Sequence, residues 1–245
     1  MIVLWLTVLG LAADPPSASA PGEGAYAMVV DVASRSKVPV AGTAEVTTRS
    51  LVRIDLVKGA SGWEQRQRVC AVEIVSDTRA ETVLPPAFVR ALPIQRYPVQ
   101  LSQDGGSWSY YADPGPNFVG FDPKVTGGSV PAKRDAPGVL DHEGDGYPGA
   151  TVLLDVPVLG DIRIYVAQKS WSRYRGQVQP DGAIAGQVEV VETVQETLGA
   201  SVSLFAASPT IEPVPARSRF RMEPVPAAET CATLAARWQG GFSID

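Results

Sequence analysis

The stretch that decides the fold is GQVQPDGAIAGQV, residues 176–188. The triplet Gly-Gln-Val stands on both sides of a Pro-Asp-Gly turn. Two strand-like runs joined by such a turn predict a β-hairpin. We therefore expect the chain on either side of it to run as antiparallel strands.

A period of two extends outward from this hairpin. In residues 44–56, apolar residues such as Val46 and Ile54 alternate with polar residues such as Glu45 and Arg53. Successive side chains of a strand point to opposite faces, so this alternation indicates a half-buried strand. The same pattern predicts further strands, among them 162–167, 183–194, 200–206 and 218–222.

The pattern as a whole predicts an all-β protein of about eight to ten strands joined by short turns. An antiparallel meandering β-barrel of lipocalin-like architecture is favoured over a two-sheet sandwich, because glycines at 176, 186 and 199 suit strongly coiled strands. At most two helical turns are expected within 84–93, a long Pro- and Gly-rich loop over 112–138, and a short C-terminal helix over 227–238.

The composition excludes some classes of function. Of the 245 residues, 45% are hydrophobic and 19% charged, which is enough apolar material for a sizeable core. The formal net charge of −5 argues against a nucleic-acid partner, which would require a basic face.

The N-terminus predicts export. Residues 1–13 are apolar, and Ala18-Ser19-Ala20 fits the small-residue pattern of a signal peptidase site, although no Lys or Arg precedes the apolar run. We expect a signal peptide over 1–20, with cleavage after Ala13 as the second choice, and a single β-barrel-like domain over 21–245. The protein would then be periplasmic or extracellular, and no later apolar run is long enough to cross a membrane.

The chain has two cysteines, Cys70 and Cys231. An isolated pair in an exported protein predicts one disulfide, which would tie the C-terminal tail to the domain. Two buried free thiols are the alternative. Cys70 lies in an alternating run that would place Arg68, Val72 and Ile74 on its own face.

Residues 141–149 form an acidic turn, DHEGDGYPG. Acidic side chains at Asp141, Glu143 and Asp145, followed by glycine, match the first half of a Ca²⁺-binding loop, and the Tyr147 carbonyl could add a backbone ligand. The residue at loop position twelve is Val152 rather than the usual glutamate. The prediction is a structural Ca²⁺ site, and the alternative is an acidic surface turn without a metal.

The single histidine, His142, limits the catalytic options. A Ser-His-Asp or Cys-His arrangement would have to use this residue in its acidic turn, and a two-histidine metal centre is impossible. No phosphate-binding glycine loop or nucleophile elbow is present in the sequence. No catalytic residue can be named, and hydrolysis by two carboxylates is the catalytic alternative that stays open.

Aromatic residues gather in two of the expected strands. Trp108 and Tyr110 share a face, and Trp171 and Tyr174 follow further along the chain. Rigid rings of this kind line the interiors of small ligand-binding barrels, which makes these four residues the candidate ligand site. Ordinary core packing is the alternative.

Three features together carry a resemblance: the D-x-[DE]-x-D-G-x-P-G turn at 141–149, the Leu-Gly-Ala-Ser segment at 198–201, and the late Cys231. In these features, over about residues 140–235, the chain resembles uncharacterised exported proteins of Gram-negative bacteria. The resemblance implies no activity. The chain is similar to lipocalins by architecture only, because Gly62-Trp63 lacks the spacing of their G-x-W motif.

These patterns favour an exported, non-catalytic barrel-like protein that binds a small apolar or amphipathic ligand or serves an envelope role with an envelope protein as partner. A cell-surface interaction module that uses the 112–138 loop is the first alternative. A carboxylate-based hydrolase is the second.

Overall fold

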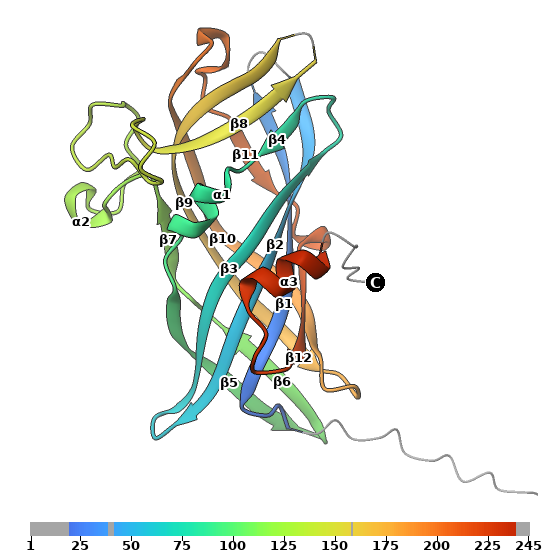
Figure 1. The fold of residues 1–245 in the computed structure, drawn as a ribbon. Coiled ribbons are helices and arrows are strands. Elements are labelled where there is room, and N and C mark those ends of the chain that lie inside the picture. The colour runs from blue at the N-terminus through green and yellow to red at the C-terminus, as the bar shows by residue number, and fades with distance from the viewer. Residues whose placement is uncertain (1–19, 39–41, 158, 239–245) are drawn as a thin grey trace, which may run out of the picture.

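The computed structural model describes residues 20–38, 42–157 and 159–238. Within these residues the chain forms one twelve-stranded sheet with three short α-helices (Figure 1). The strands are β1 (Gly24–Val38), β2 (Gly42–Gly59), β3 (Gly62–Ser76), β4 (Glu81–Val83), β5 (Gln95–Asp104), β6 (Ser107–Ala112), β7 (Pro116–Val119), β8 (Ala150–Val156), β9 (Gly160–Val178), β10 (Ile184–Ala200), β11 (Thr210–Pro213) and β12 (Arg219–Val225). The helices are α1 (Pro86–Ala91), α2 (Pro123–Thr126) and α3 (Cys231–Trp238), and two 3₁₀ turns are η1 (Ser203–Phe205) and η2 (Pro215–Arg217).

The pairings close the sheet into a ring, seen as an elongated barrel-like body in Figure 1. Starting from β12, each strand pairs antiparallel with the next in the order β12, β1, β2, β3, β5, β6, β9, β10, and β10 pairs back with β12. The predicted all-β antiparallel architecture with a C-terminal helix is confirmed. The sheet is ring-like rather than a regular barrel, because several strands divide their length among different neighbours.

The long strands β9 and β3 divide their length among several neighbours. Along β9, the neighbours are β6, then β7, then β8, with Ala112 opposite Tyr174 and Ala150 opposite Val166. Along β3, the neighbours are β5 and then β4, and β4 pairs with β8. The ring is therefore closed by β5 and β6 at one end and by β4 and β8 at the other. Helix α1 lies between these two closures, and its Phe88 packs against residues of β7, β8 and β9.

The end closed by β5 and β6 has a packed interior, which we call the packed half. Its buried residues come from seven strands. They include Tyr26, Met28, Ile54, Leu56, Tyr97, Tyr110, Val178, Ile184, Val188, Phe220 and Met222. The predicted hairpin lies here, with Gly176 opposite Gly186. A Cβ on Gly186 would lie 2.0 Å from the Arg175 carbonyl oxygen, so the two strands approach more closely than a side chain allows.

The C-terminal tail covers the outer face of this half. Leu234 of α3 packs on Ala27, Val29 and Leu51, and the predicted disulfide between Cys70 and Cys231 is present, with a Cα–Cα distance of 4.9 Å. A β-bulge in β3 makes this contact possible. Leu51 pairs with Ala71, but its neighbour Val52 pairs with Val69 rather than with Cys70. The extra residue turns both Cys70 and Ala71 toward the tail.

This bulge corrects the expected faces of β3. The prediction put Cys70 on one face with Val72 and Ile74, whereas Val72 pairs with inward-facing Ser50, and Cys70 faces outward. The alternation of faces along β3 is interrupted because one residue has no partner on β2.

Other expectations differ in their boundaries. The strand predicted over 200–206 is wrong: β10 continues to Ala200, and 203–205 is the 3₁₀ turn η1. The predicted loop over 112–138 contains β7 and α2, and α3 is shorter than the expected 227–238 helix. The predicted signal peptide lies almost wholly outside the described residues. No helix in the parts of the chain described here is long and apolar enough to span a membrane.

Candidate ligand-binding site

Strand register shows which side chains face the interior of the ring. Residues directly opposite each other in an antiparallel pair lie on the same face, and faces alternate along each strand. Met28 is buried in the packed half and pairs with Val52, so even-numbered residues of β1 and β2 face inward along their whole length. The same reasoning from Tyr174 makes the even-numbered residues of β9 inward, and their β10 partners with them.

Exposure of the inward residues changes along the ring. In the packed half most of them are buried, as for Ile54 and Ile184, both 0% exposed. Toward the β4–β8 end many inward residues are only partly buried, and we call this part the open half. Its β8–β9 wall is the exception: Ala150, Ile162 and Val166 also face inward there but are buried, and Ala150 and Val166 belong to one apolar cluster with Phe88 of α1. The partly buried inward residues of the open half include Val32, Ser34, Thr48, Ser50, Val72, Ile74, Gln168, Ser170, Ser172, Val190, Thr193 and Gln195. These residues are therefore less completely buried than most inward residues of the packed half.

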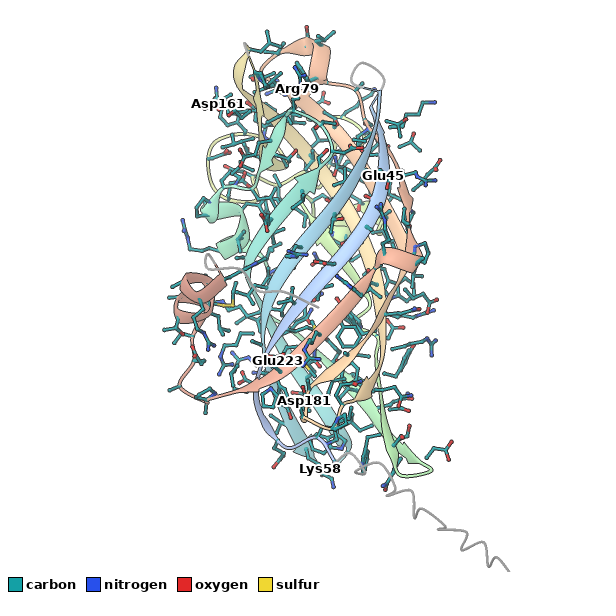
Figure 2. The ribbon with its side chains drawn as sticks, turned by 90° about the vertical axis from the view of Figure 1, so that its right-hand side faces the viewer. Glu45, Lys58, Arg79, Asp161, Asp181 and Glu223 are labelled. Carbon is teal, nitrogen blue, oxygen red and sulfur yellow. A yellow bond between two sulfur atoms is a disulfide. The ribbon has the colours of Figure 1, made fainter. Side chains whose placement is uncertain are left out.

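Figure 2 marks the two ends by their charged residues. Arg79 and Asp161 lie at the end that belongs to the open half, and Lys58 and Asp181 lie toward the other end. Along β9, Ser172 lies two residues from Tyr174. The Tyr174 ring packs edge-on against that of Phe220, with ring centroids 5.5 Å apart. The border between the two halves thus falls between Ser172 and Tyr174.

Three of the four predicted aromatic residues lie together in the packed half. Tyr110 and Tyr174 both contact the ring of Phe220, and Trp108 packs against the same cluster. Burial raises the pKa of the Tyr174 hydroxyl to about 12. All three rings therefore belong to the packed half, with Tyr174 at its border.

The fourth, Trp171, faces outward. It is three residues from Tyr174, an odd spacing that puts the two on opposite faces of a strand. Its Nε1 donates to Asp113 at 2.7 Å, and the Arg173 guanidinium lies 4.9 Å from its ring. Trp171 is thus part of the outer surface and fixes the loop that leads into β7.

A polar chain that the sequence pattern did not reveal crosses the packed half. The Tyr110 hydroxyl donates to Gln65 at 2.6 Å, Gln65 donates to the Tyr97 hydroxyl at 2.7 Å, and Tyr97 donates to Gln67 at 2.5 Å. Gln67 then donates to Gln95 at 2.5 Å. Burial raises the pKa of Tyr97 and of Tyr110 well above the ordinary tyrosine value. The alternation of Gln65 and Gln67 with charged neighbours in β3 was the available sign that glutamines face inward.

The acidic turn is held together by its own carboxylates. Asp141 accepts hydrogen bonds from the backbone N–H groups of Gly144, Asp145 and Gly146. Asp145 accepts from the Tyr147 N–H and the Thr151 hydroxyl, and Glu143 accepts from the Thr151 N–H. The three carboxylates thus point to separate backbone donors.

The turn also packs on the outer face of β9. The rings of Tyr147 and Tyr165 stack with centroids 4.7 Å apart, and His142 contacts Phe88 of α1. Within the described residues, no group of three His, Cys, Asp or Glu side chains has the geometry of a metal site. The Ca²⁺ site at Asp141, Glu143, Asp145 and Tyr147 stays a prediction.

The protonation of the turn is uneven. Burial alone would raise the pKa of Asp141, but the three backbone donors outweigh it and hold this pKa below its ordinary value. Burial raises the pKa of Glu143, whose second carboxylate oxygen is buried without a partner among the described residues. Burial also lowers the pKa of His142, whose buried Nε2 likewise has no partner there.

No protein-family model matches the chain, and no curated protein matches its sequence. Among solved structures, DynF from the dynemicin biosynthesis pathway of Micromonospora chersina aligns over 90% of this chain and 92% of its own. The two share 12% sequence identity, and the TM-score is 0.36. A score at this level does not indicate a shared fold family.

Proposed function

We propose that the protein is an exported small-molecule-binding protein and that its ligand lies in the open half of the ring. The observation that supports this is the change in exposure of the inward residues. Ile54 and Ile74 both face inward, yet Ile54 is 0% exposed and Ile74 is only partly buried. A ring packed at one end and partly exposed on its inner face at the other would form a cup, one wall of which, on β8 and β9, is packed against α1. Small barrels hold ligands in cups of this kind.

The aromatic residues would then act as the floor of this cup. Tyr174 lies at the border and would contact the inner end of a ligand, while Tyr110, 2% exposed, lies deeper. Flat, rigid side chains give a large contact area at low cost in conformational entropy. Trp171, on the outer face, would take no direct part.

Export is the second component of the proposal. The Cys70–Cys231 disulfide is compatible with an oxidising compartment, where such bonds persist. Expression in a Gram-negative host followed by fractionation and N-terminal sequencing tests it. The expected mature N-terminus is Pro21, and a cytoplasmic protein that retains residues 1–20 would contradict export.

The binding experiment uses N-phenyl-1-naphthylamine, a dye that fluoresces in apolar surroundings. We expect saturable binding to the wild-type protein. Val72→Trp should abolish it, because the larger ring occupies the open half. Glu73→Trp is the matched control, since it puts the same ring at the next position of β3 on the outer face, and it should bind as the wild type does. Equal binding by both variants would contradict the proposed location.

A further inference from the structure

We infer that the ligand of the open half is an uncharged molecule that carries hydroxyl, ether or carbonyl groups alongside an aliphatic part. This inference rests on the proposed function and adds the chemical class of the ligand. It follows from two properties of the inner surface: where the charged side chains point, and which polar groups lack partners.

Within the open half, the register turns every charged residue of β1, β2, β3, β9 and β10 outward. In β1 and β2 the odd-numbered positions are outward, and Arg35 and Glu45 pair there across the strands at 2.6 Å. In β9 and β10, Lys169 forms an ion pair with Glu192 at 2.7 Å on the outer face. Glu73 in β3 and Glu196 in β10 also fall on outward positions. The strands of this half therefore place no formal charge on its inner surface.

The polar groups on this inner surface are hydroxyls and amides. Thr48, Ser50, Ser170, Ser172, Thr193 and Gln195 all face inward and are partly buried. Their side chains make no hydrogen bond to another described residue, whereas Gln65 and Gln67 of the packed half each use both the amide nitrogen and the amide oxygen. Groups of this kind are available to donate to, or accept from, a ligand.

Between them lie aliphatic side chains, among them Val32, Val72 and Val190. A surface of this mixture suits an amphipathic ligand without charge. An ionised group would lose its hydration here and would find no opposite charge, which is unfavourable even when hydroxyls surround it.

The test uses three forms of one fluorescent polyene chain: cis-parinaric acid, its methyl ester and its alcohol. Binding to the disulfide-bonded protein is measured at pH 8, where the acid is ionised. We expect the ester and the alcohol to bind roughly tenfold more tightly than the acid, or better. The affinity for the acid should rise as the pH is lowered and its carboxylate is protonated, while the affinity for the ester stays constant.

A charge placed in the open half should reverse this order. Ser172→Lys supplies an inward ammonium group and should make the acid the preferred form, whereas Ser172→Met, similar in length but uncharged, should keep the wild-type order. Thermal melting of both variants checks that they fold. A double variant, Thr48→Val with Thr193→Val, removes two hydroxyls at nearly constant volume and should weaken the alcohol about threefold to tenfold.

The outcomes separate this inference from the proposed function. Acid bound as tightly as ester by the wild type would overturn the uncharged class while a ligand site in the open half stands. Unchanged alcohol binding by the double variant would overturn the hydrogen-bonding groups. If none of the three forms binds and N-phenyl-1-naphthylamine does not bind either, both the inference and the proposed function fall.

Discussion

The two halves of the ring are built from the same strands but differ in what their inward residues do. In β2, Ile54 and Leu56 are buried in the packed half, and Thr48 and Ser50 lie a few residues away in the open half, partly exposed. The first set stabilises the fold by removing apolar surface from water. The second set contributes little to such a core, so its side chains are available for binding. Under the proposed function, one long strand serves stability at one end and recognition at the other.

The largest expected effect compares two isoleucines that face the same interior. Ile54→Ala should lower the free energy of unfolding by roughly 2–5 kcal/mol, because it leaves a cavity in a packed core. Ile74→Ala should cost about 1 kcal/mol or less, since its side chain is already partly in water. Urea denaturation of the two variants measures the difference. Equal losses would mean that the open half is packed as tightly as the other.

The second prediction concerns the disulfide that ties the tail to the packed half. Replacing both Cys70 and Cys231 by serine should cost about 2–5 kcal/mol, because the bond closes a loop across a sequence separation of 161 residues. Hydrogen exchange should show the loss first in α3 and next to it at Ala27, Val29 and Leu51. Wild-type protein under reducing conditions is the matched control and should show the same order. Faster exchange confined to β4 and β8 would place the role of the bond in the open half instead.

The third prediction compares two inward glutamines. Gln65→Leu should cost roughly 1–3 kcal/mol, because the Tyr110 hydroxyl loses its acceptor and the Tyr97 hydroxyl loses a donor inside the packed half. Gln195→Leu should be close to neutral, since its amide bonds to no other described side chain. Thermal unfolding compares the two variants, and a large loss from Gln195→Leu would contradict the assignment of this residue to an open surface.

The strands and turns that the sequence predicted are those with a strong local pattern. The turn at 180–182 formed as expected, and Asp181 fixes it by accepting the Ala183 N–H at 3.0 Å. The alternation in 44–56 placed Val46 and Ile54 inward, as predicted, because no bulge interrupts the pairing of β2 with β1. The disulfide followed from the even count of cysteines.

Elements that depend on the partner strand were not predictable. Bulges between Val190 and Glu192 and between Thr197 and Gly199 shift the faces of β10, and a single sequence does not mark them. β4, β7 and β11 have three or four residues each, too few to show a period. The open half could not be predicted from the sequence for a further reason. Gln65 and Gln195 are both polar residues at inward strand positions, and only the packing around them in the folded protein differs.

The fourth prediction concerns the acidic turn, which packs on the outer face of β9 beside the open half. If Asp141, Glu143, Asp145 and Tyr147 bind Ca²⁺, the metal should stabilise the folded protein by about 1.4 kcal/mol at ten times its Kd. The melting temperature should then rise with Ca²⁺ and fall with a chelator, and Asp145→Ala should remove the response. A melting temperature that is indifferent to both additions would favour the acidic turn without a metal.

The smallest expected effect is the pH dependence of the same turn, in which two carboxylates act in opposite directions. The folded-state pKa of Asp141 is lowered, so its contribution to stability is present above the unfolded value near 4 and is lost as the pH falls through the folded value. The folded-state pKa of Glu143 is raised by burial, so stability is lost as the pH rises from the unfolded value through the folded one.

Melting temperatures of Asp141→Asn and Glu143→Gln between pH 3 and pH 7 separate the two carboxylates. The deficit of Asp141→Asn should shrink toward pH 3, and Glu143→Gln should gain on the wild type as the pH rises. Because the turn packs on β9 and α1, and the packed half has no part in it, Ile54→Ala should show neither trend; a pH trend in the difference between Ile54→Ala and the wild type would mean that the turn and the packed half are coupled.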